Sequence, residues 1–480
     1  MEGKPAVSNA TKGAKGPRFH LAMAVSRAAA SALKLARRNA GQMPGVIAEK
    51  IDPSFLADVD KPARVVFVSG TNGKTTTNNL LCDLLRDNGI EMIDNRAGGN
   101  VRNGVESTLI KNATFSGRQK LDVAVMELDE LSFRTVLPDL VPEVILVTNL
   151  YRDSFSRNAN PDFIFSVMSE NISPATKLVL NADDMISCRL APQNSNRVYY
   201  SIARLEDDSS DPQGIVCDLT ACPQCGGKLE YDYCHLRHLG HAHCKSCGFT
   251  NPEPDYELVA LDRDAHAFTV CERCHEGEPT YTYHFGNYSI TNLYNLFSTV
   301  VVARELGLSA EAIAASLERG INVTALRYTE KTVGGKRLVA VASKGENSTA
   351  TSVALDTIRK EPGSKAVVVM LADAHKAANP KETEYIGWYY QTDFEYLNDP
   401  SIEQIVIQGA TNLDLLPRLR MANIDPAKLC MVETPEQAAQ AVDPMSVDSV
   451  FWAFDIFNGD DVEKSRELIE KKIEEASDVR

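Results

Sequence analysis

The sequence has few of the features that membrane-spanning and nucleic-acid-binding proteins need. No run of apolar residues approaches the roughly 20 that cross a bilayer as a helix. Lys and Arg number 50 against 65 Asp and Glu, and the formal net charge is −15. A general nucleic-acid binder needs a basic surface to neutralise phosphates, and only two tryptophans are present to stack on bases. We therefore expect no nucleic-acid partner.

The N-terminus also lacks the apolar run and cleavage site of a signal peptide, which predicts a cytoplasmic protein. In that compartment the 11 cysteines are expected to be reduced thiols or metal ligands rather than disulfides. A chain of 480 residues is too long for one ordinary core. We expect two or three domains.

The basic charge is concentrated at the start of the chain. Residues 1–38 contain a single acid, Glu2, and eight basic residues: Lys4, Lys12, Lys15, Arg18, Arg27, Lys34, Arg37 and Arg38. Residues 19–39 are rich in alanine and place apolar side chains at helical spacing, at Leu21, Val25, Ala28, Ala32 and Leu35. Two interpretations stay open for this N-terminal segment, residues 1–45: a helix on an anionic membrane surface, or a helix packed on the next domain.

Two stretches alternate short apolar strands with helical segments, which is typical of mostly parallel, helix-covered sheets. The first stretch, residues 46–330, contains a Cys/His-rich insert at about 215–255. Its expected strands are residues 64–69, 121–126, 144–148, 178–180, 267–270 and 280–285, with helices at 75–88 and 290–305. The second, residues 331–480, predicts a smaller Rossmann-like α/β domain with strands at 337–342, 366–371, 404–407, 429–432 and 450–454.

A phosphate-binding loop is predicted where the first strand ends. Residues 65–77 read Val-Val-Phe-Val-Ser-Gly-Thr-Asn-Gly-Lys-Thr-Thr-Thr. Gly70 and Gly73 let backbone N–H groups converge on a phosphate at the helix N-terminus, with Thr71 and Asn72 between them. Lys74 is expected to reach the β- and γ-phosphates, and the hydroxyl of Thr75 or Thr76 to bind Mg²⁺.

The next long strand ends in an acid, Glu127. The carboxyl ends of parallel strands face the crevice where ligands bind in open α/β sheets. Glu127 is therefore a candidate ligand of the Mg²⁺ that accompanies ATP. The alternative is a solvated charge at a strand end.

Four cysteines have the spacing of a zinc ribbon. Cys222-Pro-Gln-Cys225-Gly and Cys244-Lys-Ser-Cys247-Gly are two Cys-x-x-Cys-Gly turns separated by 18 residues. Each turn directs two thiolates to one point, and two turns complete a tetrahedral Cys₄ site. Because such a site has no open coordination position, the zinc is expected to be structural.

Other cysteines and histidines nearby have no assigned role. Cys271-Glu-Arg-Cys274-His275 is a lone Cys-x-x-Cys, interpretable as a hairpin turn, a half-site or a competitor for the metal. Between the two zinc-binding turns lie further residues that we expect on the ribbon surface rather than on the metal: Cys234, His235, His238, His241 and His243.

These motifs together resemble the Mur ligase family, and in particular its MurT branch. The Ser69–Thr77 loop is similar to the ATP loop of Mur ligases, and a Cys₄ ribbon inside that domain is typical of the branch. Further similar stretches are residues 127–130, 148–153, 180–184, 222–248, 286–292 and 303–308. The similarity runs from about residue 33 to 320, and more loosely to the C-terminus.

The resemblance implies an ATP-dependent carbon–nitrogen ligase with ATP, Mg²⁺ and structural Zn²⁺. In that branch the enzyme amidates the D-glutamate α-carboxylate of the lipid II stem peptide during peptidoglycan synthesis. ATP phosphorylates the carboxylate, and ammonia displaces the phosphate. Lys74 and Glu127 match the catalytic positions, Asn292 resembles an adenine-contacting residue, and Arg327 matches an arginine near the hinge to the C-terminal domain. Asn149, Arg152 and Asp153 are expected to meet substrate or metal.

The resemblance also implies a partner, a GatD-like class I glutaminase that supplies ammonia within a heterodimer. The substrate, lipid II, lies at the inner membrane face. Family members usually carry an Asp-Gly-Arg-Asp stretch whose last Asp completes the glutaminase triad. Here residues 373–388 are longer, and no Asp stands at the aligned place. Glu384 is the first candidate for the missing carboxylate and Asp373 the second.

Two other functions remain open. One is a Mur-like ligase that adds an amino acid rather than ammonia to a cell-wall peptide precursor. The other is a zinc-ribbon ATPase acting on nucleic acid, which the acidic composition disfavours.

Overall fold

The structure is a computed structural model that describes residues 15–36, 41–96, 99–153, 160–286, 289–321, 328–371, 386–410 and 412–478. The chain divides into two compact units. Unit 1 comprises Met1–Tyr151, Asn160–Pro212 and Asp218–Val323. Unit 2 comprises Arg152–Ala159, Gln213–Cys217 and Thr324–Arg480.

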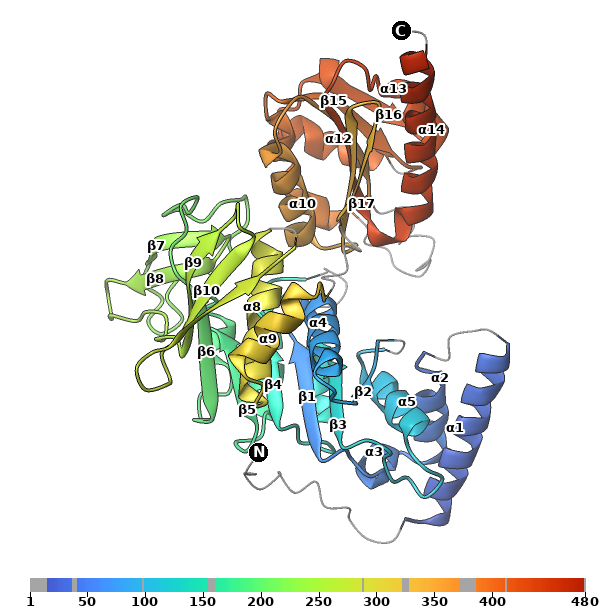
Figure 1. Cartoon of the computed structure of the whole chain (residues 1–480), viewed down its shortest axis with the longest axis vertical. Helices are drawn as coiled ribbons and strands as arrows, with labels where there is room; N and C mark the ends of the chain where they lie inside the picture. The colour runs from blue at the N-terminus through green and yellow to red at the C-terminus, as the bar shows by residue number, and fades with distance from the viewer. Residues whose placement is uncertain are drawn as a thin grey trace. The chain divides into compact units, whose positions relative to one another are not determined.

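Unit 1 is built on a nine-stranded sheet, counted over the described residues, in the order β11-β10-β9-β6-β5-β4-β1-β3-β2 (Figure 1). The seven strands from β2 to β9 in this order are parallel to one another. At the other edge, β10 pairs antiparallel with both β9 and β11. The strands are β1 (Arg64–Ser69), β2 (Ile93–Asp94), β3 (Val123–Glu127), β4 (Val144–Val147), β5 (Lys177–Asn181), β6 (Arg197–Ile202), β9 (Tyr256–Asp262), β10 (Ala267–Glu272) and β11 (Thr280–His284).

Helices cover both faces of this sheet, which is why the middle of β1 is a continuous apolar run. Val65 and Phe67 point into one core and Val66 and Val68 into the other, so all four are buried. The first core is closed by α1 (Pro17–Leu35), α2 (Met43–Ile51), α3 (Phe55–Asp58), α5 (Arg102–Asn112), α6 (Phe133–Val136) and α7 (Pro161–Asn171). The second is closed by α4 (Lys74–Asp87), α8 (Ile290–Glu305) and α9 (Ala310–Glu318).

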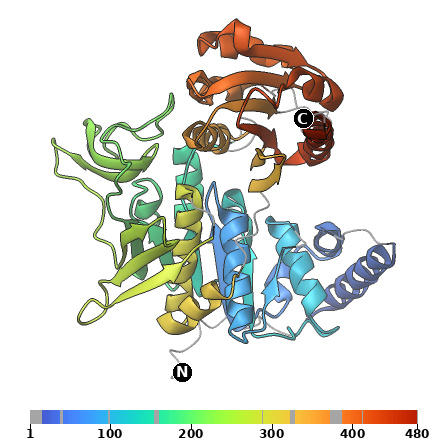
Figure 2. The same cartoon turned by 45° about the horizontal axis from the view of Figure 1, so that its top comes forward.

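Helix α1 confirms the expected N-terminal helix but packs through a different face from the predicted stripe. Phe19, Ala22, Met23 and Ser26 are buried, in a helix that lies beyond α2 and α5 at the margin of unit 1 (Figure 2). The stripe identified from the sequence faces outward, with Leu21 57%, Val25 40% and Leu35 89% exposed. In the described part of the chain, no helix has both the length and the apolar character to cross a bilayer.

The Cys/His-rich insert forms a small two-stranded hairpin, β7 (Leu229–Leu236) and β8 (Leu239–Cys244). It is inserted between β6 and β9, which are neighbours in the large sheet. The chain therefore leaves the sheet and returns beside the strand it left, so the insert does not interrupt the sheet. We call residues Asp218–Asn251 the ribbon.

Unit 2 contains a six-stranded sheet, over its described residues, in the order β12-β13-β17-β14-β15-β16. All neighbours are parallel except β12 and β13. Its strands are β12 (Tyr328–Val333), β13 (Lys336–Ser343), β14 (Lys365–Met370), β15 (Ile402–Gln408), β16 (Leu429–Val432) and β17 (Ser449–Asp455). One face packs on α10 (Ser348–Lys360) and α12 (Asn412–Met421), the other on α13 (Pro435–Ala441) and α14 (Gly459–Asp478). The predicted second α/β sheet is confirmed.

Candidate functional site

The predicted phosphate loop lies at the carboxyl end of β1, between the ends of β3 and β4. This is the point where successive strands are added on opposite sides, and such points are the usual ligand crevices of open α/β sheets. Gly70 and Gly73 have φ of 119° and 87°. A β-carbon would lie 2.3 Å from Thr148 Oγ1 at Gly70 and 2.1 Å from Asn295 Oδ1 at Gly73. Both positions therefore require glycine, for conformation and for space.

The loop is held by the two residues that follow β4. Thr148 donates its hydroxyl to the carbonyl of Asn72 at 2.7 Å. The Asn149 amide accepts from the backbone N–H of Asn72 at 3.0 Å and donates to its carbonyl at 3.1 Å. The N–H of Thr71 donates to the Asn149 carbonyl at 2.9 Å. Asn149, expected to meet substrate or metal, binds the loop in this structure.

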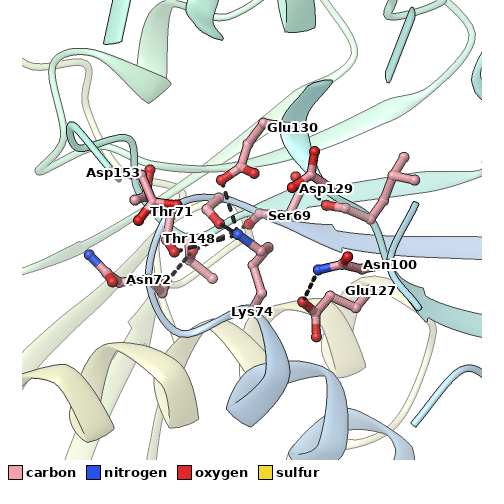
Figure 3. A network of polar contacts seen from close by, with 12 residues as sticks. Ser69, Thr71, Asn72, Lys74, Asn100, Glu127, Asp129, Glu130, Thr148 and Asp153 are labelled. Atoms are coloured by element: carbon pink, nitrogen blue, oxygen red, sulfur yellow. Dashed lines mark hydrogen bonds and ion pairs between the residues drawn. The ribbon is translucent and has the colours of Figure 1, made fainter. Parts of the chain in front are cut away.

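Lys74 is the first residue of α4 and is buried beside an acid that the sequence reasoning did not select. Its ammonium lies 3.0 Å from Glu130 Oε1 (Figure 3), with the two side chains 8% and 2% exposed. It also donates to the carbonyls of Gly70 and Thr71. Glu130 opens a short 3₁₀ turn, Glu130–Ser132, just after β3. Because an unpaired buried ammonium is costly, this carboxylate stabilises Lys74 in the loop.

Thr75 and Glu127, the two expected Mg²⁺ ligands, are in direct contact. The Thr75 hydroxyl donates to Glu127 Oε2 at 2.7 Å, and Asn100 donates to the other carboxylate oxygen at 2.7 Å. Asn95 anchors the main chain of Glu127 on both sides, at 2.9 and 2.8 Å. An oxygen-rich pair beside a phosphate loop is the ligand chemistry that Mg²⁺ prefers.

The remaining predicted nucleotide residues are spread more widely. Thr76 is half-buried in the first turn of α4, and Asn292 lies in the first turn of α8, where its N–H donates to the cap Ser289 at 3.1 Å. One turn further along α8, Asn295 accepts from Thr77 at 3.3 Å. Three candidates lie outside the described residues: Arg327, Asp373 and Glu384.

The four ribbon cysteines converge. The Sγ atoms of Cys222, Cys225, Cys244 and Cys247 all lie within 4.8 Å of one another. The pairs Cys222–Cys247 and Cys225–Cys244 are each 3.6 Å apart. Gly226 and Gly248 take φ of 72° and 74°, which closes each turn. Four thiols around one point fit a tetrahedral Zn²⁺ or an iron of similar preference, and no open position is left for substrate.

The expectation that the other ribbon residues lie on the surface is wrong for three of them. Cys234, His235 and His238 are buried, because the tip of the hairpin enters the core of unit 1. His241 and His243 do lie exposed, and both contact Asp232. His241 and His243 stand two residues apart on β8, so their side chains lie on the same face of the hairpin.

Comparison with known proteins places this site in a family. The Mur ligase middle domain model matches residues 68–215, and the MurT ligase C-terminal model matches residues 345–453. Among solved structures, a pseudomurein peptide ligase type C from Methanothermus fervidus has a TM-score of 0.60 at 22% identity, over 88% of this chain and 81% of that one. MurF ligase from Thermotoga maritima in complex with ADP has a TM-score of 0.56 at 15% identity, over 90% and 85%.

The fold is therefore that of the Mur ligases, enzymes that form amide bonds at the expense of ATP. The lipid II isoglutaminyl synthase (glutamine-hydrolyzing) subunit MurT of Staphylococcus aureus (strain COL) is 31% identical over 84% of this chain and 88% of its own length. Its counterpart in Streptococcus pneumoniae (strain ATCC BAA-255 / R6) is 26% identical over 84% and 86%. The chain belongs to the MurT family of Mur ligases and is an ATP-dependent amide-bond ligase.

Four polar residues of this site were missed by the sequence reasoning: Asn95, Asn100, Glu130 and Asn295. Glu130 alone carried a signal, since it stands three residues after Glu127 in a stretch already singled out. The others act across 27 or more residues of chain, as with the Asn100–Glu127 pair at a separation of 27 and the Thr77–Asn295 pair at 218. No local pattern identifies such partners.

Proposed function

We propose that this protein is the ligase subunit of a lipid II isoglutaminyl synthase, which amidates the D-glutamate α-carboxylate of the stem peptide to D-isoglutamine. The observation that supports the proposal most is the placement of Lys74, Thr75 and Glu127 at the carboxyl ends of the neighbouring strands β1 and β3, in a chain similar to MurT along most of its length. Amidation in two steps suits this arrangement. A carboxylate oxygen attacks the γ-phosphorus and ADP leaves; ammonia then attacks the acyl carbon of the acyl phosphate and phosphate leaves.

The residues of the loop are assigned to the first of these steps. Backbone N–H groups of Gly70–Gly73 and the first turn of α4, with Thr75 and Thr76, hold the phosphates at the positive end of a helix. Lys74 neutralises charge on the β- and γ-phosphates. Thr75 and Glu127 are the residues that would hold Mg²⁺, which would supply positive charge to stabilise the phosphates.

Lys74 must change partners for this to happen. In the structure its ammonium lies on Glu130 and two loop carbonyls. A phosphate offers a higher negative charge in the same place, so the ammonium exchanges the carboxylate for phosphate when ATP binds. Glu130 thus gives the buried lysine a counter-ion.

Amidation by purified variants tests this assignment. With lipid II, ATP and ammonium as substrates, Lys74→Ala and Glu127→Ala should each lower kcat by about 100-fold or more, as removal of a charge-stabilising group does. A matched control is Lys120→Ala, an exposed lysine near β3 that contacts neither residue. Normal turnover in either active-site variant would refute the assignment. If amino acids but not ammonium are incorporated, the amino-acid-adding alternative is correct.

We also propose that ammonia comes from a separate GatD-like class I glutaminase, with which the chain forms a heterodimer. Free ammonia is scarce at neutral pH, and a glutaminase nucleophile must ionise easily. Two candidate thiols here do the opposite: burial raises the pKa of Cys82 to about 12, and burial also raises that of Cys188. The chain by itself should not hydrolyse glutamine.

The C-terminal region carries the assigned docking segment, residues 373–388, with Glu384 first and Asp373 second as the carboxylate that orients the partner's histidine. The heterodimer should be purified and glutamine hydrolysis compared for Glu384→Gln and Asp373→Asn. Loss in one variant identifies the carboxylate. Full activity in both means that the partner completes its own triad.

The two units suggest a division of labour. We assign ATP binding to residues 46–330, with the ribbon at about 215–255, and the C-terminal ligase domain to residues 331–480. Asn292 is assigned to the adenine and Arg327 to the nucleotide near the hinge. Asn292→Ala should raise the KM for ATP with little change in kcat. The four ribbon thiols are assigned to structural Zn²⁺.

We place the protein in the cytoplasm, with α1 at the inner membrane face. The stripe Leu21, Val25, Ala28, Ala32 and Leu35 is unpartnered by the described chain, and the same segment is basic in an otherwise acidic protein. Apolar area plus basic charge is the pattern that binds anionic lipid surfaces, at about 1 kcal/mol per basic residue. Vesicles containing phosphatidylglycerol should sediment the wild type. Leu21→Glu should abolish sedimentation and Phe163→Glu, an exposed aromatic on α7, should not.

A further inference from the structure

The tip of the ribbon hairpin enters unit 1, far along the hairpin from its cysteines. Strands β7 and β8 pair from Leu229 and Cys244 at the cysteine end to Leu236 and Leu239 at the other. The two residues that join them, Arg237 and His238, are 2% and 1% exposed. One end of the hairpin therefore carries the four cysteines, and the other end is buried among residues that follow strands β4 and β5.

His238 holds a buried carboxylate at that point. Its Nε2 lies 3.2 Å from Asp184 Oδ1, and both side chains are fully buried. Burial alone would raise the pKa of Asp184, but the hydrogen bond and charge of His238, with further hydrogen bonds, outweigh it and lower that pKa. Asp184 is thus a charged acceptor, and His238 is the side chain that stabilises its charge.

Asp184 in turn fixes the chain that follows β4. Its Oδ2 accepts from the backbone N–H of Leu150 at 2.7 Å, and its Oδ1 from that of Ile186 at 2.9 Å. The next residue, Tyr151, has its ring 4.5 Å from the imidazole of His238, centroid to centroid. Leu150 is therefore held by the Asp184 carboxylate, and Tyr151 packs against His238 at the ribbon tip.

This same peptide segment holds the phosphate loop. The N–H of Tyr151 donates to Thr71 Oγ1 at 3.0 Å, and the Thr71 hydroxyl donates to the Tyr151 carbonyl at 3.1 Å. Asn149, one residue before Leu150, makes the contacts to Asn72 described above. A continuous series of contacts thus runs from His238 through Asp184 and Leu150–Tyr151 to Thr71.

A second set of contacts joins the ribbon to α8. The N–H of Gly240 in β8 donates to the carbonyl of Asp183 at 2.9 Å. The Asp183 carboxylate accepts from the hydroxyls of Ser201 at 2.6 Å and Tyr294 at 2.7 Å. Tyr294 lies on α8 between Asn292 and Asn295. The ribbon therefore contacts both elements that border the proposed nucleotide site.

We propose that His238 is a positioning residue for ATP: the ribbon tip sets the phosphate loop in its binding geometry. This inference rests on the proposed function, because it takes the loop to be the ATP site. Backbone donors stabilise phosphate only where they already point at it, so a loosened Thr71–Asn72 segment lowers affinity.

Two substitutions of His238 separate positioning from general stability. Glutamine places an N–H donor close to the place of Nε2, whereas leucine fills a similar volume with no donor. We expect His238→Leu to weaken ADP binding at least about tenfold by calorimetry, and to raise the KM for ATP by more than it lowers kcat. His238→Gln should restore affinity to within about threefold of the wild type. Zinc content should stay unchanged in both variants.

His241→Leu is the matched control, because the His241 side chain is exposed on the same hairpin, where it contacts Asp232 and lies 5.9 Å from the ring of Tyr233, centroid to centroid. It should bind ADP as the wild type does. Should His238→Leu fail to fold, Tyr151→Leu removes the ring contact but keeps the main-chain hydrogen bonds, and should weaken ADP binding about threefold. Unchanged ADP affinity in folded His238→Leu, or in Tyr151→Leu, would overturn the inference. Failure of the wild type to bind ADP would instead refute the proposed function.

Discussion

Two hairpins of unit 1 each carry a Cys-x-x-Cys sequence, yet they are stabilised in different ways. In the ribbon, the turn at Cys222–Cys225 meets a second turn at Cys244–Cys247, and four thiols converge. In the β10–β11 hairpin, Cys271 is buried with its Sγ 3.7 Å from the Glu278 carbonyl, while Cys274 is exposed. Over the residues that the structure describes, no other thiol, histidine or acid joins that second pair as a metal site.

An ion pair organises the second hairpin. Glu272, 1% exposed, receives two hydrogen bonds from Arg304 of α8, at 2.6 and 2.8 Å, and a third from His275 at 2.7 Å. Burial would raise the pKa of Glu272, but these partners outweigh it and lower that pKa. The comparison shows that a Cys-x-x-Cys spacing specifies a turn, and that a metal site needs a second turn brought to the same point.

The largest effect is expected for the buried ribbon thiols. Cys222→Ser and Cys244→Ser should each abolish zinc binding and prevent stable folding of the ribbon, because zinc contributes on the order of 10 kcal/mol to folding of isolated zinc-finger peptides. Elemental analysis of the purified protein measures zinc binding, and thermal unfolding measures its stability. A wild type without zinc, or a fully stable variant, would mean that the four thiols do not form a structural zinc site.

The next effect concerns the ion pair. Arg304→Met keeps most of the packing and leaves the buried Glu272 without its strongest partner, which should cost about 3 kcal/mol in the free energy of unfolding. Zinc content should stay at the wild-type value. Denaturant unfolding followed by circular dichroism gives the free energy. Loss of zinc in this variant would show that the two hairpins are not independent.

A smaller loss of stability, equal in the two hairpins, is expected when one glycine in each is replaced by alanine. Gly248 and Gly277 take φ of 74° and 80°, and a β-carbon at either would meet no atom within 4 Å. Only backbone strain remains, so Gly248→Ala and Gly277→Ala should each cost about 1–2 kcal/mol. Thermal unfolding of both variants side by side is the measurement. A much larger loss of stability in Gly248→Ala than in Gly277→Ala would indicate that metal binding depends on the backbone conformation of this turn.

The smallest effect is expected for Cys274→Ser. The thiol is exposed and its Sγ lies 4.0 Å from His275 Nδ1, a weak contact, so stability should change by less than about 0.5 kcal/mol and zinc content not at all. Zinc titration with a chromogenic chelator is the direct measurement. Release of zinc from this variant would show that the second pair competes for the metal.

Much of the fold was predictable because the strands are buried on both faces. The predicted bounds of β1, β16 and α8 agree with the structure, since each is a continuous apolar or periodic segment with clear ends. Strand β9, by contrast, was not predicted. Its residues Val259 and Ala260 are exposed, and it follows the ribbon directly, so its pattern is too weak to separate from the insert. The outward face of α1 was also beyond prediction, because both of its faces are apolar.

The sequence by itself determined the chemistry that stays within a few residues: the Gly70–Lys74 loop, the Cys-x-x-Cys-Gly turns and the strand end at Glu127. These depend on local backbone conformation, which neighbouring residues control. Only the tertiary structure decided which residues meet them. Glu130 on Lys74, Asn100 on Glu127 and His238 on Asp184 are brought together by strand order and by the return of the ribbon into the core. Such contacts join residues distant in the chain, and charge and burial give them their effect.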